Sequence, residues 1–273
     1  MGSFGGFFNY EKPGPGVFKD GPKKRSFFVF FEIFFKNFWK LALVSLVYSV
    51  LSVLLIPCGL AQAGMTNVAR NIARDKHSFG VSDFFDTIKK NWKQALPAGI
   101  INLVVTSLLC GAMYFYFMSD GWFSIVAFGV SVACFIIFSF MKYHVWLLII
   151  TFKLPLSKIY KNSFLFVFIN LKRNLLITLF AVLCYGAIIG LASIPVVIAG
   201  LLAGLLAICV APGFINLVIQ YNIFPAVKKH MIAPYYESHP GEDVELRRNL
   251  GLEIEEEEDA VFDDTGLLKE EKK

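Results

Sequence analysis

The feature that most constrains this chain is a set of long apolar runs with almost no charge. A helix needs about 17 to 25 apolar residues to cross a bilayer. The runs of that length are 38–56 (interrupted only by Lys40), 95–118, 122–141, 175–192 and 195–217. Hydrophobic residues make up 56% of the chain and charged residues only 17%, against about 25% charged in an average soluble domain. The sequence therefore predicts a membrane protein.

A sixth segment, 57–69, has low hydropathy. It is predicted to be a membrane helix because of the positions of the charged residues around it. Lysine and arginine gather in cytoplasmic loops of membrane proteins. With five spans, the basic clusters 19–40 and 70–93 would face opposite sides of the membrane. With six, all 26 Lys and Arg lie on one side. We therefore expect an all-α, polytopic membrane helical bundle with six helices in three hairpins, located in the plasma membrane with both termini cytoplasmic.

A short repeat precedes three of the spans. The segments 31–38, 85–92 and 168–175 each contain a Phe, an apolar residue three positions later, and a basic residue followed by Asn. Such a segment suits an interfacial amphipathic helix whose cation reaches the lipid phosphates, so we expect 27–38 and 81–92 to lie along the cytoplasmic interface. The expected interfacial anchors are Lys36, Trp39, Asp83, Lys90, Asn91, Trp92, Arg173 and Asn174.

Pairs of small residues four positions apart mark surfaces where helices can approach closely. Packing within one chain is the expected use of these pairs, and a contact between copies of the chain is the alternative. The pairs are Gly59 with Ala63, Gly129 with Ala133, Gly186 with Gly190, and Gly200 with Gly204.

No catalytic template is found in the sequence. It contains no phosphate-binding loop of the form G-x-x-x-x-G-K-[ST], no G-x-S-x-G elbow and no H-E-x-x-H zinc motif. Its four histidines, His77, His144, His230 and His239, fall in four separate segments. Ion pumps usually carry a charged residue deep in the membrane, and we expect none at mid-depth here. The chain is therefore expected to be no enzyme and to hold no metal or cofactor.

Neutral polar residues within the membrane segments are the candidate functional groups. In hydrocarbon they need partners, so they form hydrogen bonds between helices or line a polar path. We expect 57–69 to be the softest part of the membrane domain, with its polar residues facing other helices or a water-filled cleft. The candidate intramembrane polar face consists of Gln62, Thr66, Asn67, Asn102, Asn216 and Gln220.

Composition divides the chain into three parts. Residues 1–25 form a Gly/Pro-rich cytoplasmic segment without the apolar core of a cleavable signal peptide. Residues 26–236 form the helical membrane domain. Residues 237–273 hold 14 acidic against 5 basic residues, a composition typical of disorder. Docking of this tail onto a basic patch is the alternative to a purely solvated tail.

Several short motifs resemble the YesL-like family of bacterial membrane proteins, also called domain of unknown function 624. The motifs are FNYEKPGPGV at 8–17, FFEI at 30–33, FWKL at 38–41, DFF at 83–85 and KNW at 90–92. The resemblance extends over about residues 4 to 236. It implies a plasma-membrane protein of a Gram-positive bacterium, of a kind often encoded near sugar-importing ABC transporters. No catalytic residue belongs to the family.

Two functions follow from these observations. The first is a non-enzymatic accessory or partner-binding component of carbohydrate ABC import or sensing, whose partners are the lipid bilayer and an ABC permease or membrane sensor. The alternative is a transporter or channel for a small neutral solute in its own right, favoured if Gln62, Asn67, Asn102 and Asn216 enclose a polar path. No nucleic-acid partner is expected, and a homo-oligomer is left open.

Overall fold

The structure, a computed structural model, describes residues 26–54 and 57–234. The regular structure of these residues is entirely helical. The elements are α1 (Ser26–Lys36), α2 (Phe38–Val53), α3 (Cys58–Ala73), α4 (Val81–Met118), α5 (Trp122–Thr151), α6 (Leu156–Ile169), α7 (Leu171–Ala192), α8 (Val197–Leu205), η1 (Leu206–Val210), α9 (Ala211–Val227) and η2 (Lys228–Ile232). The glycine-rich N-terminal segment and the acidic tail of the sequence prediction lie outside the described residues.

Four of the described helices are long and apolar enough to cross a membrane. They are α4, α5, α7 and the continuous helix Val197–Ile232, which comprises α8, η1, α9 and η2. The chain is therefore a multi-pass membrane protein by the length and composition of its helices. The helix α2 is apolar but has only 16 residues, and α3 has the same length with lower hydropathy. The structure thus supports four spans directly and leaves the predicted count of six unconfirmed.

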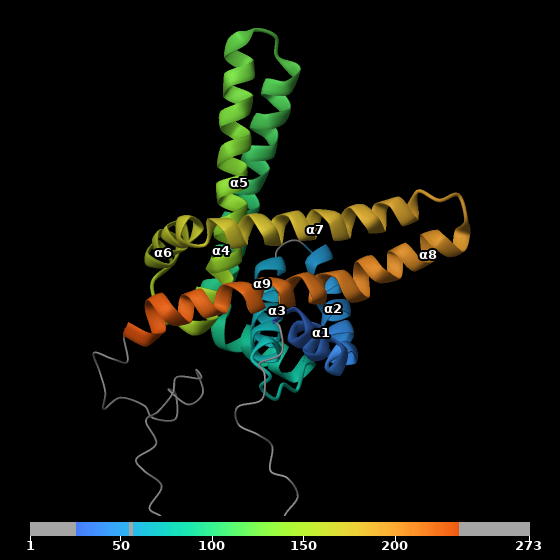
Figure 1. The fold of residues 1–273 in the computed structure, drawn as a ribbon. Helices are drawn as coiled ribbons and strands as arrows, with labels where there is room; N and C mark the ends of the chain where they lie inside the picture. Colours follow the sequence, from blue (N-terminus) through green and yellow to red (C-terminus); the bar gives the residue numbers. More distant parts are fainter. Residues whose placement is uncertain (1–25, 55–56, 235–273) are drawn as a thin grey trace, which may run out of the picture.

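Two helical hairpins project from a common base (Figure 1). One consists of α4 and α5, which meet at a tight turn where Gly121 has a φ of 105° that favours glycine. The other consists of α7 and α8, and α9 brings the chain back to the base formed with α1, α2 and α3. The hairpins project in different directions, so this conformation does not show three parallel hairpins.

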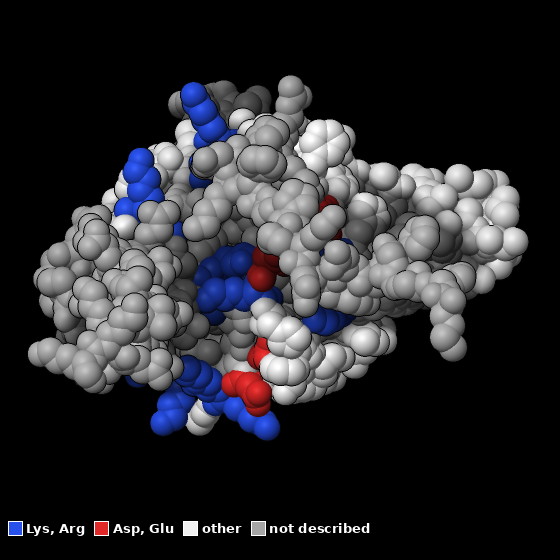
Figure 2. All heavy atoms as spheres, turned by 60° about the horizontal axis from the view of Figure 1, so that its bottom comes forward, with Lys and Arg blue, Asp and Glu red and all other residues white. Residues whose placement is uncertain are grey.

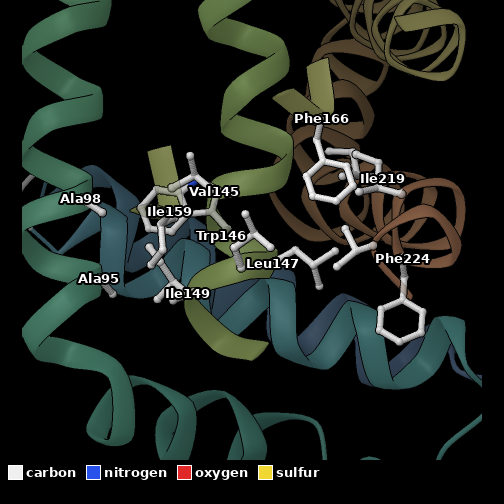
Figure 3. Close-up of a cluster of buried hydrophobic side chains, with 14 of the residues drawn as sticks. Ala95, Ala98, Val145, Trp146, Leu147, Ile149, Ile159, Phe166, Ile219 and Phe224 are labelled. Carbon is white, nitrogen blue, oxygen red and sulfur yellow. The ribbon is translucent and has the colours of Figure 1, made fainter. Parts of the chain in front are cut away.

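The helix α4 combines the predicted interfacial segment with a membrane span. Its 38 residues correspond to roughly 57 Å at 1.5 Å per residue, well beyond the roughly 30 Å hydrocarbon layer. Residues 81–92 are the first turns of α4 rather than a separate helix. Pro97 lies inside α4, where it removes one backbone hydrogen bond, and Figure 3 shows α4 turning below Ala95.

The helix α3 is the centre of the molecule. Nine of its 16 residues are buried, among them Ala61, Ala63, Met65 and Val68, which are fully enclosed. It packs against α2, α4, α5 and α9. A helix surrounded by protein needs small residues for close contact and no apolar surface for lipid, which explains its low hydropathy. The expectation that 57–69 is the softest part of the membrane domain therefore does not fit its central, enclosed position.

Close backbone contacts fix α3 in this position. A Cβ atom added to Gly59 would lie 2.5 Å from the Cα atom of Gly99 in α4, and one added to Gly64 would lie 2.7 Å from the ring of Phe84. The expected Gly59–Ala63 contact surface is therefore used within the chain. By contrast, no described atom lies within 4 Å of such a Cβ at Gly129, Gly186, Gly190, Gly200 or Gly204. The expected packing against another helix of the same chain is therefore wrong for these glycines.

Two apolar clusters hold the helices at the base. The larger one joins α3, α4, α5, α6, α7 and α9, and Figure 3 shows Val145, Trp146 and Leu147 of α5 near its centre. The second joins α1, α2, α3, α4 and α9, with the buried Phe30, Ile33 and Phe34 supplied by α1. Within α7, only Asn174 and Ile177 are buried, and α8 buries only Ala203. The projecting hairpins therefore expose apolar surface suited to lipid.

Most Lys and Arg side chains of the described residues lie at the base of the molecule. Figure 2 shows Lys and Arg gathered on this face and none on the visible described surface of the hairpin at the right. The sequence explains this, because it contains no Lys or Arg between Lys93 and Lys142 or between Arg173 and Lys228.

Candidate functional site

A polar cavity of about 500 Å³ lies at the crossing of the central helices. Such a volume is within the range of roughly 300 to 1,000 Å³ typical of small-molecule sites. Five of the six residues of the predicted polar face line it. They are Gln62 and Thr66 from α3, Asn102 from α4, and Asn216 and Gln220 from α9.

Hydrogen bonds between helices orient part of this lining. The Nε2 atom of Gln62 donates to Oδ1 of Asn216 at 2.9 Å, which joins α3 to α9. The Nδ2 atom of Asn216 donates to the Pro212 carbonyl oxygen at 2.9 Å, and the hydroxyl of Thr66 donates to the Gln62 carbonyl oxygen at 2.7 Å. These three side chains are therefore held in place by partners within the protein.

Two other amides of the lining keep an unpaired atom. Oδ1 of Asn102 accepts a hydrogen bond from the Tyr160 hydroxyl at 3.1 Å, but its buried Nδ2 has no partner among the described residues. The Oε1 atom of Gln220 is likewise buried without a partner there. The exposed fractions of the two residues are only 7% and 1%. An unpaired buried polar group costs about 1 to 3 kcal/mol, so two residues that line the cavity each keep one polar group that a rearranged side chain could pair with a bound molecule.

Asn67 is the member of the predicted face that does not line the cavity. It lies nearer the charged base, where its Nδ2 donates to Oγ1 of Thr87 at 2.7 Å. Its Oδ1 accepts from Nη2 of Arg70 at 2.7 Å, and Nη1 of Arg70 donates to Oγ1 of Thr151 at 3.0 Å. These four residues join α3, α4 and α5 into one network, which we call the Arg70 network.

The lining also contains aromatic residues and one cation, Lys142, which no pattern in the sequence marked. Lys142 lies one residue after the predicted end of its span at 141, and α5 continues to Thr151. Its ammonium lies 5.8 Å from the centre of the Phe138 ring on the same helix. Polar residues stand out within an apolar run and so revealed the amide lining, but no such signal marks an aromatic residue there. The aromatic lining residues are Tyr48, Tyr143, Trp146 and Tyr185.

The predicted anchors on α1, α2 and α4 lie mostly at the surface of the base. The ammonium of Lys36 donates to Oδ1 of Asp75 at 2.8 Å, and the Asp75 carboxylate raises the pKa of Lys36. Trp39 and Trp92 are exposed by 78% and 51%, as is suitable for contact with lipid headgroups. Lys90 is also exposed.

Asp83 and Asn91 form hydrogen bonds with neighbouring groups of the same region. Oδ2 of Asp83 accepts hydrogen bonds from the Ser78 hydroxyl at 2.7 Å and from the Phe79 amide at 3.0 Å, which fixes the start of α4. The Nδ2 atom of Asn91 donates to the Thr87 carbonyl oxygen at 3.0 Å.

The predicted anchors on α7 differ from one another. Arg173 is exposed, and its Nη1 donates to the Asn222 carbonyl oxygen at 3.1 Å. Asn174 is fully buried, and its Nδ2 lies 3.3 Å from the Val167 carbonyl oxygen that accepts its proton. Asn174 is therefore a structural residue at the junction of α6 and α7, and the prediction of an interfacial anchor is wrong for this residue.

The part of the chain that the structure describes contains no cluster of residues suited to metal binding or redox chemistry. No group of three or more His, Cys, Asp or Glu is placed to hold a metal ion within 26–54 and 57–234. The five cysteines are free. His144 is fully buried, with its ring stacked 5.5 Å from that of Phe166.

Comparison with known proteins identifies a family for part of the chain. Residues 41–112, which run from the first turn of α2 to near the end of α4, match the family model described as Protein of unknown function, DUF624. No curated protein and no solved structure matches the chain. The matched segment contains α3 and the first half of the cavity lining. The match confirms, over this segment, the resemblance to the YesL-like or DUF624 family.

Proposed function

We propose that this protein binds a small neutral, polyhydroxylated solute in the cavity between α3, α4, α5 and α9. On this proposal it is a non-enzymatic component of the plasma membrane that acts as a sensor or accessory of carbohydrate import. The observation that carries the proposal is the pair of buried unpaired atoms, Nδ2 of Asn102 and Oε1 of Gln220, in the lining of one cavity.

The chemistry of the lining favours a neutral solute. No acidic side chain lines the cavity, and Lys142 is the single charged residue among the lining residues that the structure describes. Amides and hydroxyls both donate and accept hydrogen bonds, as a molecule with several hydroxyl groups requires. The rings of Trp146 and Tyr143 add apolar surface beside these polar groups, a combination typical of small-molecule sites.

The Arg70 network favours a solute-binding cavity over an open channel for the solute. Arg70 lies on α3 one turn beyond Thr66, on the side toward the charged base. A continuous polar path through the protein would require the bonds of Arg70 to Thr151 and Asn67 to open. This supports a binding cavity closed at the base, while the shared lining by Gln62, Asn102 and Asn216 keeps a gated transporter as the second candidate.

Three contacts at the base support an even number of crossings, as the proposed topology of six crossings with both termini inside requires. Lys36 precedes α2 and Asp75 follows α3, yet their side chains are 2.8 Å apart. Nε2 of Gln94 reaches the carbonyl oxygen of Leu154 after α5 at 3.0 Å. Arg173 of α7 similarly reaches Asn222 of α9. Each contact requires the chain between its partners to return to the same face of the membrane.

A ligand screen tests solute binding directly. The protein in mild detergent is heated with a panel of neutral mono- and disaccharides, polyols and charged sugar phosphates as probes. Ligand at about 100 times its Kd stabilises the folded state by about 2.7 kcal/mol. We expect the unfolding temperature to rise with a neutral sugar or polyol and this rise to disappear in Asn102→Leu and Gln220→Leu.

The matched control is Asn162→Leu, an amide of α6 that does not line the cavity. It should retain the ligand-induced shift. A panel without any stabilising neutral solute, or equal loss of the shift in Asn162→Leu, contradicts the proposal.

The accessory role is tested by co-purification in mild detergent. A stoichiometric permease or sensor partner supports it. A protein that purifies alone and moves the bound solute into liposomes contradicts the accessory role and favours the transporter.

A further inference from the structure

A second cavity, independent of the solute site, is lined by cations at the charged base. It has a volume of about 680 Å³ and lies between the start of α7 and the end of α9. Lys172, Arg173, Lys229 and His230 line it, and its lining includes no acidic residue. Lys172, Arg173 and Lys229 are exposed. This cationic cavity is suited to an anionic group carrying phosphate oxygens.

An apolar groove adjoins the cationic cavity. It has a volume of about 420 Å³ and lies between α1, α7 and α9. Phe27, Phe30, Leu176 and Phe180 are among its apolar lining residues. Arg173 lines both the groove and the cationic cavity, so it marks the junction of the two.

The same order of polar and apolar residues occurs on both helices of the site. Along α7, the cations at 172 and 173 come first and the groove residues at 176 and 180 follow deeper in the span. The continuous helix of α9 and η2 runs in the opposite sense, from Val218 in the groove to Lys229 of η2 in the cationic cavity. The 11 positions between 218 and 229 correspond to about 16 Å of helix, close to half of a bilayer's hydrocarbon thickness of roughly 30 Å.

We propose that this site binds one anionic phospholipid, with its phosphate group at Arg173 and an acyl chain in the groove between α1, α7 and α9. The charge of the cavity complements an anionic headgroup, and the depth order of the residues matches the order of headgroup and chain in one leaflet. Basic pockets between membrane helices on the cytoplasmic side are known to suit such headgroups.

Lipid titration of the purified full chain tests the proposal. Phosphatidylglycerol and phosphatidylcholine with identical acyl chains are added to the protein in neutral detergent, and bound lipid is counted by native mass spectrometry. We expect phosphatidylglycerol to bind at least roughly fivefold more tightly. Arg173→Gln combined with Lys229→Gln should abolish this preference, while Lys158→Gln, an exposed cation of α6 outside both cavities, should keep it.

A second pair of variants tests the acyl-chain groove. Leu176→Gln should weaken binding of both lipids, and Leu183→Gln should not, because Leu183 is comparably exposed on α7 but lies outside the groove. Equal binding of the two lipids by the unmodified protein overturns the proposal. So does binding of inorganic phosphate or glycerol phosphate as tight as that of the lipid, which would identify a site for free phosphate.

Discussion

At the scale of single residues, glycine positions separate the surfaces used within the chain from those left open. The sequence presents Gly59, Gly186 and Gly200 in the same small-residue pattern. Only the structure distinguishes them, because Gly59 meets Gly99 of α4, whereas Gly186 and Gly200 face no described atom within 4 Å. A sequence pattern marks where helices are able to approach, and the partner helix is fixed by the long-range fold.

Gly99→Ala is expected to destabilise the protein by about 1 to 3 kcal/mol. The added Cβ would lie 2.7 Å from the Cα atom of Gly59, and backbone cannot move aside as a flexible side chain would. Gly186→Ala is the control, because nothing described lies within 4 Å there and alanine favours the helix. Thermal unfolding in detergent measures both, and a loss in Gly186→Ala equal to that in Gly99→Ala would refute the assignment of the contact.

The ion pair of Lys36 and Asp75 gives the folded state a dependence on alkaline pH. The pKa of Lys36 is raised from 10.5 by Asp75. The ion pair therefore contributes fully to stability below pH 10.5. This contribution is lost as the pH rises through the higher pKa that Lys36 has in the folded state. The effect is small, because the side chains of Lys36 and Asp75 are 63% and 59% exposed and water screens their attraction.

Lys36→Met is expected to remove this dependence. The difference in unfolding temperature between the unmodified protein and the variant should be constant from pH 7 to 9 and shrink above pH 10.5. A difference that persists unchanged to the highest pH would show that Lys36 stabilises the fold by packing of its aliphatic chain instead.

At the scale of helices, the sequence predicts best where lipid surrounds the helix. The spans of α5 and α7 are apolar on most of their surface, as contact with lipid requires. Hydropathy alone therefore predicts them from the sequence. The buried helix α3 has small and polar residues, and charge positions alone indicated it. The polar side chains of Gln62 and Thr66 in this segment also predicted an inward polar face. The aromatic half of the cavity could not be predicted, since Trp146 resembles any other apolar residue of α5.

The Arg70 network should make a measurable contribution to the packing of α3 on α4 and α5. Asn67→Leu removes the acceptor of Arg70 and the donor to Thr87, which leaves two polar groups without that partner. We expect a loss of about 1 to 3 kcal/mol in the free energy of unfolding. Asn71→Leu, one turn further along α3 and partly exposed, is the control and should change stability much less. Equal effects of the two variants would show that the network is dispensable.

At the scale of the whole molecule, the short pair α2 and α3 decides the number of crossings. Each has 16 residues, about 24 Å of helix, less than the roughly 30 Å of a hydrocarbon layer. The contact of Lys36 with Asp75 brings their outer ends to one face. The pair therefore either crosses a locally thinned membrane twice or enters and leaves by the same face.

Cysteine labelling of intact cells distinguishes the two arrangements. In a variant lacking the five native cysteines, Leu54→Cys lies at the end of α2, where Leu54 is 63% exposed. Six crossings predict that a membrane-impermeant maleimide labels this position from outside, as it labels Asp120→Cys and Ser193→Cys, while Lys89→Cys reacts only after permeabilisation. Protection of Leu54→Cys, with labelling of Asp120→Cys retained, would instead establish α2 and α3 as a re-entrant pair and reduce the number of full crossings to four.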